Sequence, residues 1–142
     1  MRVVDDWWGG RSIAHLLHPF FFIHFQETSL IAEVDRRLVG FLVGFLSQTF
    51  ADQAYVHLLA VDPAYRGRGL GRELYSRFFE IARRHGRWRV RCVTAPVNVG
   101  SVAFHLKLGF RIEAGDDEVD SVAVQRDFAG PGENRVLLVK EL

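Results

Sequence analysis

The sequence contains a single cysteine, Cys92, and no long apolar run. One cysteine cannot form an internal disulfide, so we expect a reducing compartment and a small, buried thiol. The longest apolar stretch, residues 38–46, contains two glycines and falls short of the ~20 residues that a membrane-spanning helix needs. No apolar segment follows the charged start of the chain, so no secretory signal is predicted. These absences predict a cytoplasmic protein without a membrane partner.

The sequence also lacks zinc-ligand spacing, a basic tail and aromatic residues interleaved with its basic ones. Net charge is only +1, yet nine arginines fall between Arg66 and Arg91, and acidic residues crowd positions 113–120. A basic segment of this kind suits nucleic acid, a membrane surface or a phosphorylated ligand. Because no other nucleic-acid feature accompanies it, we expect neither nucleic acid nor a metal as a partner.

The apolar content is sufficient for one core. The 142 residues fit a single domain, residues 1–142, and 49% of them are hydrophobic. Periodicity and turn residues predict two short helices in 12–27, separated at Pro19, and strands at 29–34, 38–47 and 54–61. A helix is predicted from Leu70 to near Gly86, then a strand at 88–94 and a helix at 98–108 with Asn98 and Gly109 as its caps. The last strands are predicted at 110–113 and 135–141, with a long acidic loop between them at 114–134. This order predicts an α+β or mixed α/β fold.

A glycine-rich loop between a predicted strand and helix points to function. Glycines let a ligand approach the backbone, and the free N–H groups and dipole of a helix start favour an anion. The spacing fits neither Gly-x4-Gly-Lys-Ser/Thr nor Gly-x-Gly-x-x-Gly, and a plain turn is the alternative. The loop predicts a pyrophosphate cradle formed by Arg66, Gly67, Arg68, Gly69, Leu70, Gly71 and Arg72.

Two motifs give the chain a resemblance to a known family. The spacing Arg-x-x-Gly-x-Gly from Arg66 resembles the acetyl-coenzyme A motif of the GNAT N-acetyltransferases. Residues 98–110 resemble the family's later motif, Asn-x-x-Ser-x-x-Phe-Tyr-x-x-Leu-Gly-Phe, with His105 in place of its Tyr. The resemblance covers about residues 29–141. The family's first strand and helix precede the point where this chain starts, so a truncated N-terminal edge is expected.

The resemblance implies a central, mostly antiparallel and splayed sheet flanked by helices. It also implies acetyl-CoA as co-substrate, with the pyrophosphate at residues 66–72 and no metal. An N–H at Leu59 or Ala60 is expected to stabilise the oxyanion. The pantetheine arm is expected along one strand end and one helix, at Leu59, Ala60, Val61, Asn98, Ser101 and Phe104.

Two histidines are candidates for proton transfer. His57 stands nine residues before Arg66, where histone-acetylating relatives have a Glu base, and imidazole is a suitable base at neutral pH. The alternative for His57 is a half-buried structural role. His105, at the family's Tyr position, is expected to protonate the departing thiolate, or else to have no chemical role. Tyr55, on the same face as His57, would orient a water or the substrate.

The activity implied is acyl-CoA-dependent N-acetylation of a primary amine, on a small molecule or a peptide, by direct attack in a ternary complex. The alternatives are a catalytically silent acyl-CoA-binding domain and a nucleic-acid or nucleotide-binding module. An exposed edge strand is compatible with a homodimer. Trp7, Trp8 and residues 20–25 are expected in the core, with an acceptor pocket as the alternative. The acidic loop is expected to be solvated, and its alternative role is to attract a cationic acceptor.

Overall fold

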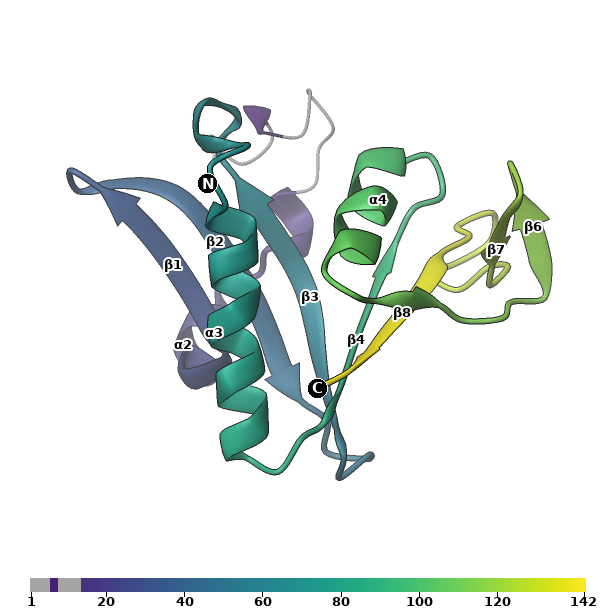
Figure 1. Ribbon diagram of the computed structural model, residues 1–142, viewed down its shortest axis with the longest axis horizontal. Coiled ribbons are helices and arrows are strands. Elements are labelled where there is room, and N and C mark those ends of the chain that lie inside the picture. The colour runs from purple at the N-terminus through teal and green to yellow at the C-terminus, as the bar shows by residue number, and fades with distance from the viewer. Residues whose placement is uncertain (1–5, 8–13) are drawn as a thin grey trace. The chain divides into compact units, whose positions relative to one another are not determined.

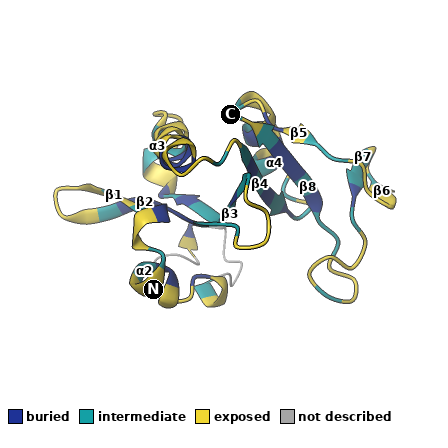
Figure 2. Ribbon diagram, turned by 90° about the horizontal axis from the view of Figure 1, so that it is seen from below, coloured by how far each residue is buried: buried dark blue, intermediate teal, exposed yellow. Residues whose placement is uncertain are grey.

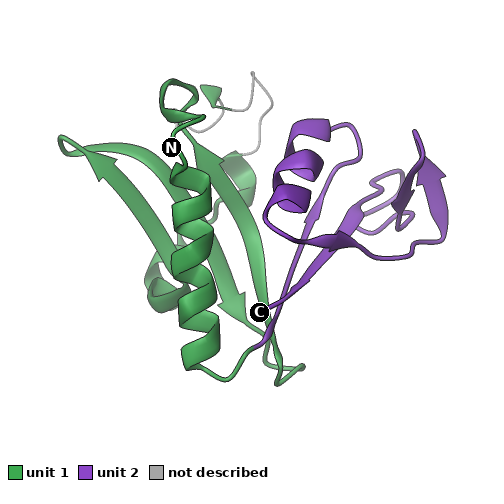
Figure 3. Ribbon diagram, viewed as in Figure 1, with its two compact units in different colours: residues 1–87 green, residues 88–142 purple. Residues whose placement is uncertain are grey.

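The computed structural model describes residues 6–7 and 14–142. The chain separates into two compact units, Met1–Arg87 and Trp88–Leu142, which Figure 3 distinguishes by colour. Among the described residues, the first unit contains three antiparallel-paired strands and a 15-residue helix, and the second contains five such strands and a nine-residue helix. The mixed α+β class and the mostly antiparallel pairing predicted from the sequence are confirmed.

The first unit is a three-stranded meander surrounded by helical segments (Figure 1). The turn between its first two strands has positive φ at Asp35 (50°) and Arg36 (63°), as in tight two-residue hairpins. The three predicted strands are confirmed to within one residue at each end. In chain order the elements are η1 (Ala14–Leu16), α2 (Phe20–His24), η2 (Gln26–Thr28), β1 (Ser29–Val34), β2 (Arg37–Leu46), β3 (Gln53–Val61), η3 (Pro63–Tyr65) and α3 (Leu70–Arg84).

Strand β2 is covered on both faces. Figure 2 shows α3 on one face of the meander and α2 on the other. A strand buried on both faces needs a continuous apolar run, and the middle of β2 is such a run. On the α3 side, a Cβ atom at Gly44 would lie 2.7 Å from Cε2 of Phe78, so the glycine permits the close approach of the helix.

Helix α3 has one apolar stripe, as its sequence period predicts. Leu74, Phe78 and Ile81 are buried, and the intervening arginines and glutamates are exposed. The helix ends where Gly86 was expected to cap it: the Gly86 N–H donates to Arg83 O, and the Arg87 N–H donates to Ala82 O.

Strand β3 contains a bulge at His57. Val56 pairs with Gly44 and Leu58 pairs with Val43, so His57 has no partner on β2. As a result, His57 and Leu58 face the same side although they are adjacent. The His57 ring stacks on Phe21, and Leu58 packs against the cluster that contains Phe21.

The second unit pairs its first strand with the last one along their whole length, from Arg89 opposite Glu141 to Thr94 opposite Val136. Burial alternates along the first strand, and Cys92 is buried as expected. The predicted helix is confirmed at slightly shorter length. The elements are β4 (Arg89–Thr94), α4 (Val99–Lys107), β5 (Arg111–Ile112), β6 (Asp117–Val119), β7 (Val122–Val124) and β8 (Val136–Glu141).

The prediction of an unstructured loop over residues 114–134 is wrong. The segment contains the β6–β7 hairpin, which turns at Asp120 (φ 48°) and Ser121 (φ 65°). An Asp-Ser pair lacks the glycine that usually marks such a turn, and three-residue strands are too short to show alternation. Among the described residues, no helix has both the length and the apolar character to cross a membrane.

Candidate active site

The glycine-rich loop leaves β3 through η3 and enters α3. Gly67 (φ 74°) and Gly69 (φ 83°) lie in the left-handed region, which side chains other than glycine adopt at a cost. Among the described residues, apart from each glycine's own chain neighbours, no atom lies within 4 Å of the position that a Cβ would occupy at either glycine. The backbone of the loop is therefore open to a ligand on this side.

The N-terminus of α3 has amides without an acceptor. Gly69 is the N-cap residue and offers no side-chain cap, while its carbonyl accepts from the Glu73 N–H at 2.9 Å. Within the described part of the chain, the amides of Leu70, Gly71 and Arg72 have no hydrogen-bond acceptor. Three free N–H groups at the positive end of a 15-residue helix favour an anion.

The three arginines of the loop make different contacts. The Arg66 guanidinium donates to Val61 O, at 3.1 Å from Nε, and to Trp7 O, so it ties the loop to the end of β3. The guanidinium of Arg68 lies over the Tyr65 ring, 5.2 Å from its centroid. Arg72 is exposed in the first turn of α3. Arg68 and Arg72 therefore supply the positive charge near the free amides, whereas Arg66 holds the backbone.

The buried carboxylate of Asp62 fixes the start of the loop. The sequence predicted only that a strand ends at this point, not the contacts of Asp62. The side chain of Asp62 accepts from the Ala64 N–H at 2.9 Å and lies 3.3 Å from the Arg37 guanidinium. Asp62 is 5% exposed. The pair fixes where β3 ends, which in turn fixes the direction of the loop.

Upstream on β3, the side chain of His57 faces the helical segments at the start of the unit. Its Nε2 lies 3.0 Å from the carbonyl oxygen of Leu16, and its ring stacks on Phe21 with centroids 4.9 Å apart. Tyr55, two residues earlier on the same face, stacks on Phe45 at 5.3 Å. Leu59, Ala60 and Val61 complete the strand and pair with β2.

In the second unit, the predicted residues of α4 bond mainly within the helix. Asn98 is the N-cap, as predicted, and its Oδ1 accepts from the Ser101 N–H at 3.3 Å. The Ser101 carbonyl accepts from Nδ1 of His105 at 2.7 Å, and the Phe104 ring meets the His105 ring edge-on. Gly109 caps the other end, as expected: its N–H donates to Leu106 O.

His105 is buried at 7% exposure. Burial lowers the pKa of its imidazole, and the hydrogen bond to the Ser101 carbonyl offsets part of that effect by raising it. The ring is therefore neutral near pH 7, with its proton on Nδ1 and held by the Ser101 carbonyl.

Comparison with known proteins identifies the family. Residues 3–110 match the model of the Acetyltransferase (GNAT) family, which is more than half of the chain. The chain belongs to the GNAT family. It is 37% identical over 102 residues to the L-2,4-diaminobutyric acid acetyltransferase of Nocardia farcinica. That alignment covers 72% of this chain and 50% of the relative, so the chain spans about half the length of the relative it matches.

Solved structures share the GNAT fold. Ard1 from Thermoplasma volcanium matches with a TM-score of 0.71 at 24% identity, over 87% of this chain and 76% of that one. The Salmonella typhimurium protein yncA, solved with its cofactor acetyl-CoA, matches with a TM-score of 0.68 at 22% identity, over 95% and 78%.

The expectation that the aromatic segment of this GNAT chain lies in the core holds only in part, because Phe20, Ile23 and His24 are exposed. Trp7 and Phe21 are buried, and Trp7 stacks on Phe41 at 6.2 Å. Trp8 lies outside the described residues. Beside this cluster is an apolar hollow of about 360 Å³, lined by Leu17, Pro19, Phe22, Ile23, Ile31, Leu38 and Phe41.

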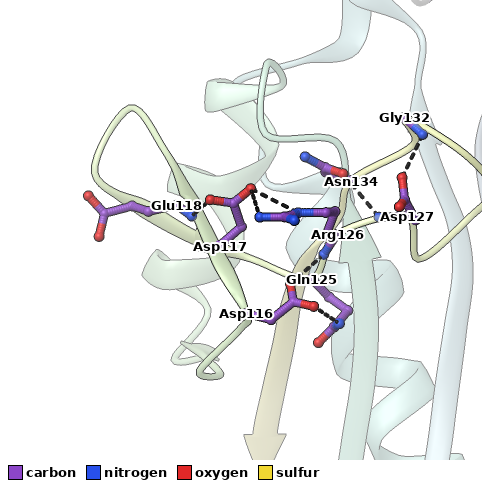
Figure 4. A network of polar contacts seen from close by, with 8 residues as sticks. All are labelled: Asp116, Asp117, Glu118, Gln125, Arg126, Asp127, Gly132 and Asn134. Carbon is purple, nitrogen blue, oxygen red and sulfur yellow. Dashed lines mark hydrogen bonds and ion pairs between the residues drawn. The ribbon is translucent and has the colours of Figure 1, made fainter.

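Several carboxylates of the acidic segment form hydrogen bonds within the second unit (Figure 4). Asp116 accepts from the Gln125 side chain and from the Arg126 N–H, both at 2.8 Å. Asp117 pairs with the Arg126 guanidinium at 3.1 Å, and Asp127 accepts from the Gly132 N–H. These carboxylates stabilise the hairpin and the turn after it. In the part of the chain that the structure describes, no group of three or more possible metal ligands converges.

Proposed function

We propose that this chain transfers the acetyl group of acetyl-CoA to a primary amine. The observation that carries the proposal is the start of α3, where three amides without acceptors follow two open, left-handed glycines. A pyrophosphate fits this chemistry because it accepts several N–H bonds and carries charge that the helix dipole and nearby arginines offset.

In this proposal the residues of the loop have separate roles in binding acetyl-CoA. The amides of Leu70, Gly71 and Arg72 bind the pyrophosphate oxygens, and the side chains of Arg68 and Arg72 add charge. Arg66 keeps the loop in place through its bonds to backbone carbonyls. Acetyl-CoA, when bound, supplies the acetyl group as a thioester. Leu59, Ala60 and Val61 border the thioester end, where an N–H of Leu59 or Ala60 would stabilise the oxyanion.

His57 is proposed as the general base. An alkylammonium acceptor must lose a proton before its nitrogen can attack a carbonyl carbon, and a neutral imidazole accepts that proton. The side chain of His57 is only half-buried, so an acceptor can reach it. Tyr55, on the same face, is proposed to orient the acceptor or a water.

His105 fits a positioning role better than the proton-donor role. Its neutral ring gives its one proton to the Ser101 carbonyl, and a second proton would require a buried cation. We therefore propose that His105 shapes α4, together with Ser101 and Phe104, and that Asn98 and Ser101 contact the cofactor through this helix. The thiolate would then take its proton from water.

For the acceptor, we propose a small amine of the class named for the Nocardia farcinica relative, a diamino acid such as L-2,4-diaminobutyric acid. The test is release of free coenzyme A thiol from acetyl-CoA, measured with a panel that includes L-2,4-diaminobutyrate, simple alkylamines and peptides with a free N-terminus. Thiol release that depends on one of these amines, with a matching acetylated product by mass spectrometry, is the expected result.

A catalytically silent acyl-CoA-binding domain is the second candidate, because His105 offers no spare proton where the family's Tyr stands. Such a domain would bind acetyl-CoA as tightly as an enzyme. It would release no thiol above the hydrolysis rate with any amine of the panel. Calorimetric binding of acetyl-CoA together with the thiol assay separates the two candidates.

A further inference from the structure

The orientation of the His57 imidazole is determined by a backbone carbonyl. Leu16 ends the short helix η1, and the last carbonyls of a helix have no partner within it. The Leu16 oxygen lies 3.0 Å from Nε2 of His57. Because a carbonyl oxygen can only accept a hydrogen bond, Nε2 must carry the proton of the neutral ring. The lone pair of the imidazole is then on Nδ1.

A second contact fixes the plane of the same ring. Phe21 stacks on His57 with centroids 4.9 Å apart and planes 18° apart. Phe21 is itself 5% exposed and packs in a cluster with Leu17, Phe41 and Val43, so its ring cannot turn freely. The carbonyl fixes one edge of the imidazole and Phe21 fixes one face.

The bulge in β3 makes both contacts possible. His57 is unpaired opposite β2, and it faces the side on which η1 and α2 lie. The two contacts reach this side chain from residues 36 and 41 positions away along the chain. Burial of the cluster alone would not require a histidine here, nor the hydrogen bond to Leu16.

We propose that Leu16 and Phe21 hold His57 so that Nδ1, and not Nε2, accepts the proton of the acceptor amine; Phe21 is a positioning residue. This inference rests on the proposed function. In the step, an ammonium N–H bond breaks and an Nδ1–H bond forms, which gives an imidazolium and a neutral amine. The amine nitrogen then bonds to the thioester carbon and releases its second proton to water, the C–S bond breaks, and the thiolate takes a proton from water. The Nε2–H continues to donate to Leu16 throughout.

The first test needs no turnover. Long-range nitrogen–proton correlation spectra of the full chain distinguish a protonated from an unprotonated ring nitrogen in each histidine, and the His57 signals are assigned by their loss in His57→Gln. We expect neutral His57 to have a protonated Nε2 and an unprotonated Nδ1. A spectrum with the proton mainly on Nδ1 would overturn the inference. This readout stands even if no amine is acetylated, in which case only the proposed function fails.

The second test compares two phenylalanines of similar burial. Phe21→Leu removes the stacked ring, and Phe79→Leu makes the same change at an 8% exposed position on α3. We expect Phe21→Leu to lower kcat roughly tenfold, because a misplaced base is costly, with acetyl-CoA affinity within twofold. Phe21→Tyr should restore most of the loss, and Phe79→Leu should keep the parent kcat. Equal losses in both leucine variants, or none in Phe21→Leu, would overturn the positioning role.

Discussion

Gly69 and Gly86 stand at opposite ends of helix α3 in closely similar conformations, with φ of 83° and 68°. In the part of the chain that the structure describes, neither has an atom other than those of its chain neighbours within 4 Å of the place where a Cβ would lie. A side chain at either position would meet the same backbone strain of about 1–3 kcal/mol and no steric clash within the protein. Only Gly69 lies beside the free amides.

The similar φ angles of Gly69 and Gly86 allow a matched test of whether the glycine-rich loop binds acetyl-CoA. We expect Gly69→Val to weaken acetyl-CoA binding more than tenfold, because the side chain would occupy the space open to the pyrophosphate. Gly86→Val should lose comparable stability and keep the parent Kd. Isothermal titration calorimetry and thermal melts measure both quantities. Equal affinities in the two variants would remove the loop from the binding site.

The base role of His57 predicts a change in the shape of the pH profile. The parent turnover should rise with pH along an acidic limb of the profile, because only a neutral imidazole accepts a proton. His57→Ala should lose at least about tenfold in kcat and flatten that limb. His85→Ala, at the exposed end of α3, is the control and should keep the profile. A folded His57→Ala protein with the parent limb would assign the proton to water.

His105 predicts a pH dependence of stability. Burial lowers its pKa in the folded chain, so below the ordinary value of about 6.5 the unfolded chain binds a proton that the folded chain does not. Its contribution to stability is therefore lost as the pH falls from about 6.5 toward the lowered pKa, by at most ~1.4 kcal/mol per pH unit.

His105→Phe removes that proton site and can keep the edge-on packing against Phe110. Urea denaturation at pH 7.5 and 5.5 should show a smaller loss of unfolding free energy in the variant than in the parent. The same variant should keep kcat within a few-fold. A loss of turnover of two orders of magnitude with unchanged stability would instead assign His105 a proton-donor role.

The close contact between Gly44 and α3 predicts opposite effects of one substitution at two glycines. Gly44→Ala would place a Cβ 2.6 Å from the Tyr55 carbonyl oxygen and 2.7 Å from Cε2 of Phe78, so we expect the free energy of unfolding to fall by about 1–3 kcal/mol. Gly100 lies on α4, and outside its own helix backbone no atom of the described residues is within 4 Å of its Cβ position, so Gly100→Ala should gain up to ~1 kcal/mol. Chemical denaturation of both variants measures the difference. A neutral Gly44→Ala would show that α3 can move away from the strand.

The features predicted correctly from the sequence are those whose cause lies within a few residues. Asn98, Gly86 and Gly109 cap helices through bonds to neighbours, and the apolar stripe of α3 repeats within four residues. The glycine loop was visible for the same reason, since a strand, three glycines and a helix follow one another directly.

The features that were missed depend on distant partners. The bond from Arg66 to Trp7 spans 59 residues, and the contact of His57 with Leu16 spans 41. The β6–β7 hairpin is held by the Asp116 side chain, which accepts from the Arg126 N–H, and by the ion pair between Asp117 and the Arg126 guanidinium, and these residues have no regular spacing. Two of these contacts orient His57 and Arg66, so the motif indicates a candidate site but not its internal geometry.

The bulge in β3 also bears on insertions and deletions. Val56 pairs with Gly44 and Leu58 pairs with Val43. If residue 57 were deleted, Val56 and Leu58 would be consecutive and would pair with consecutive residues of β2 without a bulge. Every remaining side chain of the strand would keep its present face, and the sheet would pair more regularly than it now does. His57 is the residue of β3 that the described pairing with β2 does not require, and a regular ladder would not place an imidazole against the end of η1 in this way.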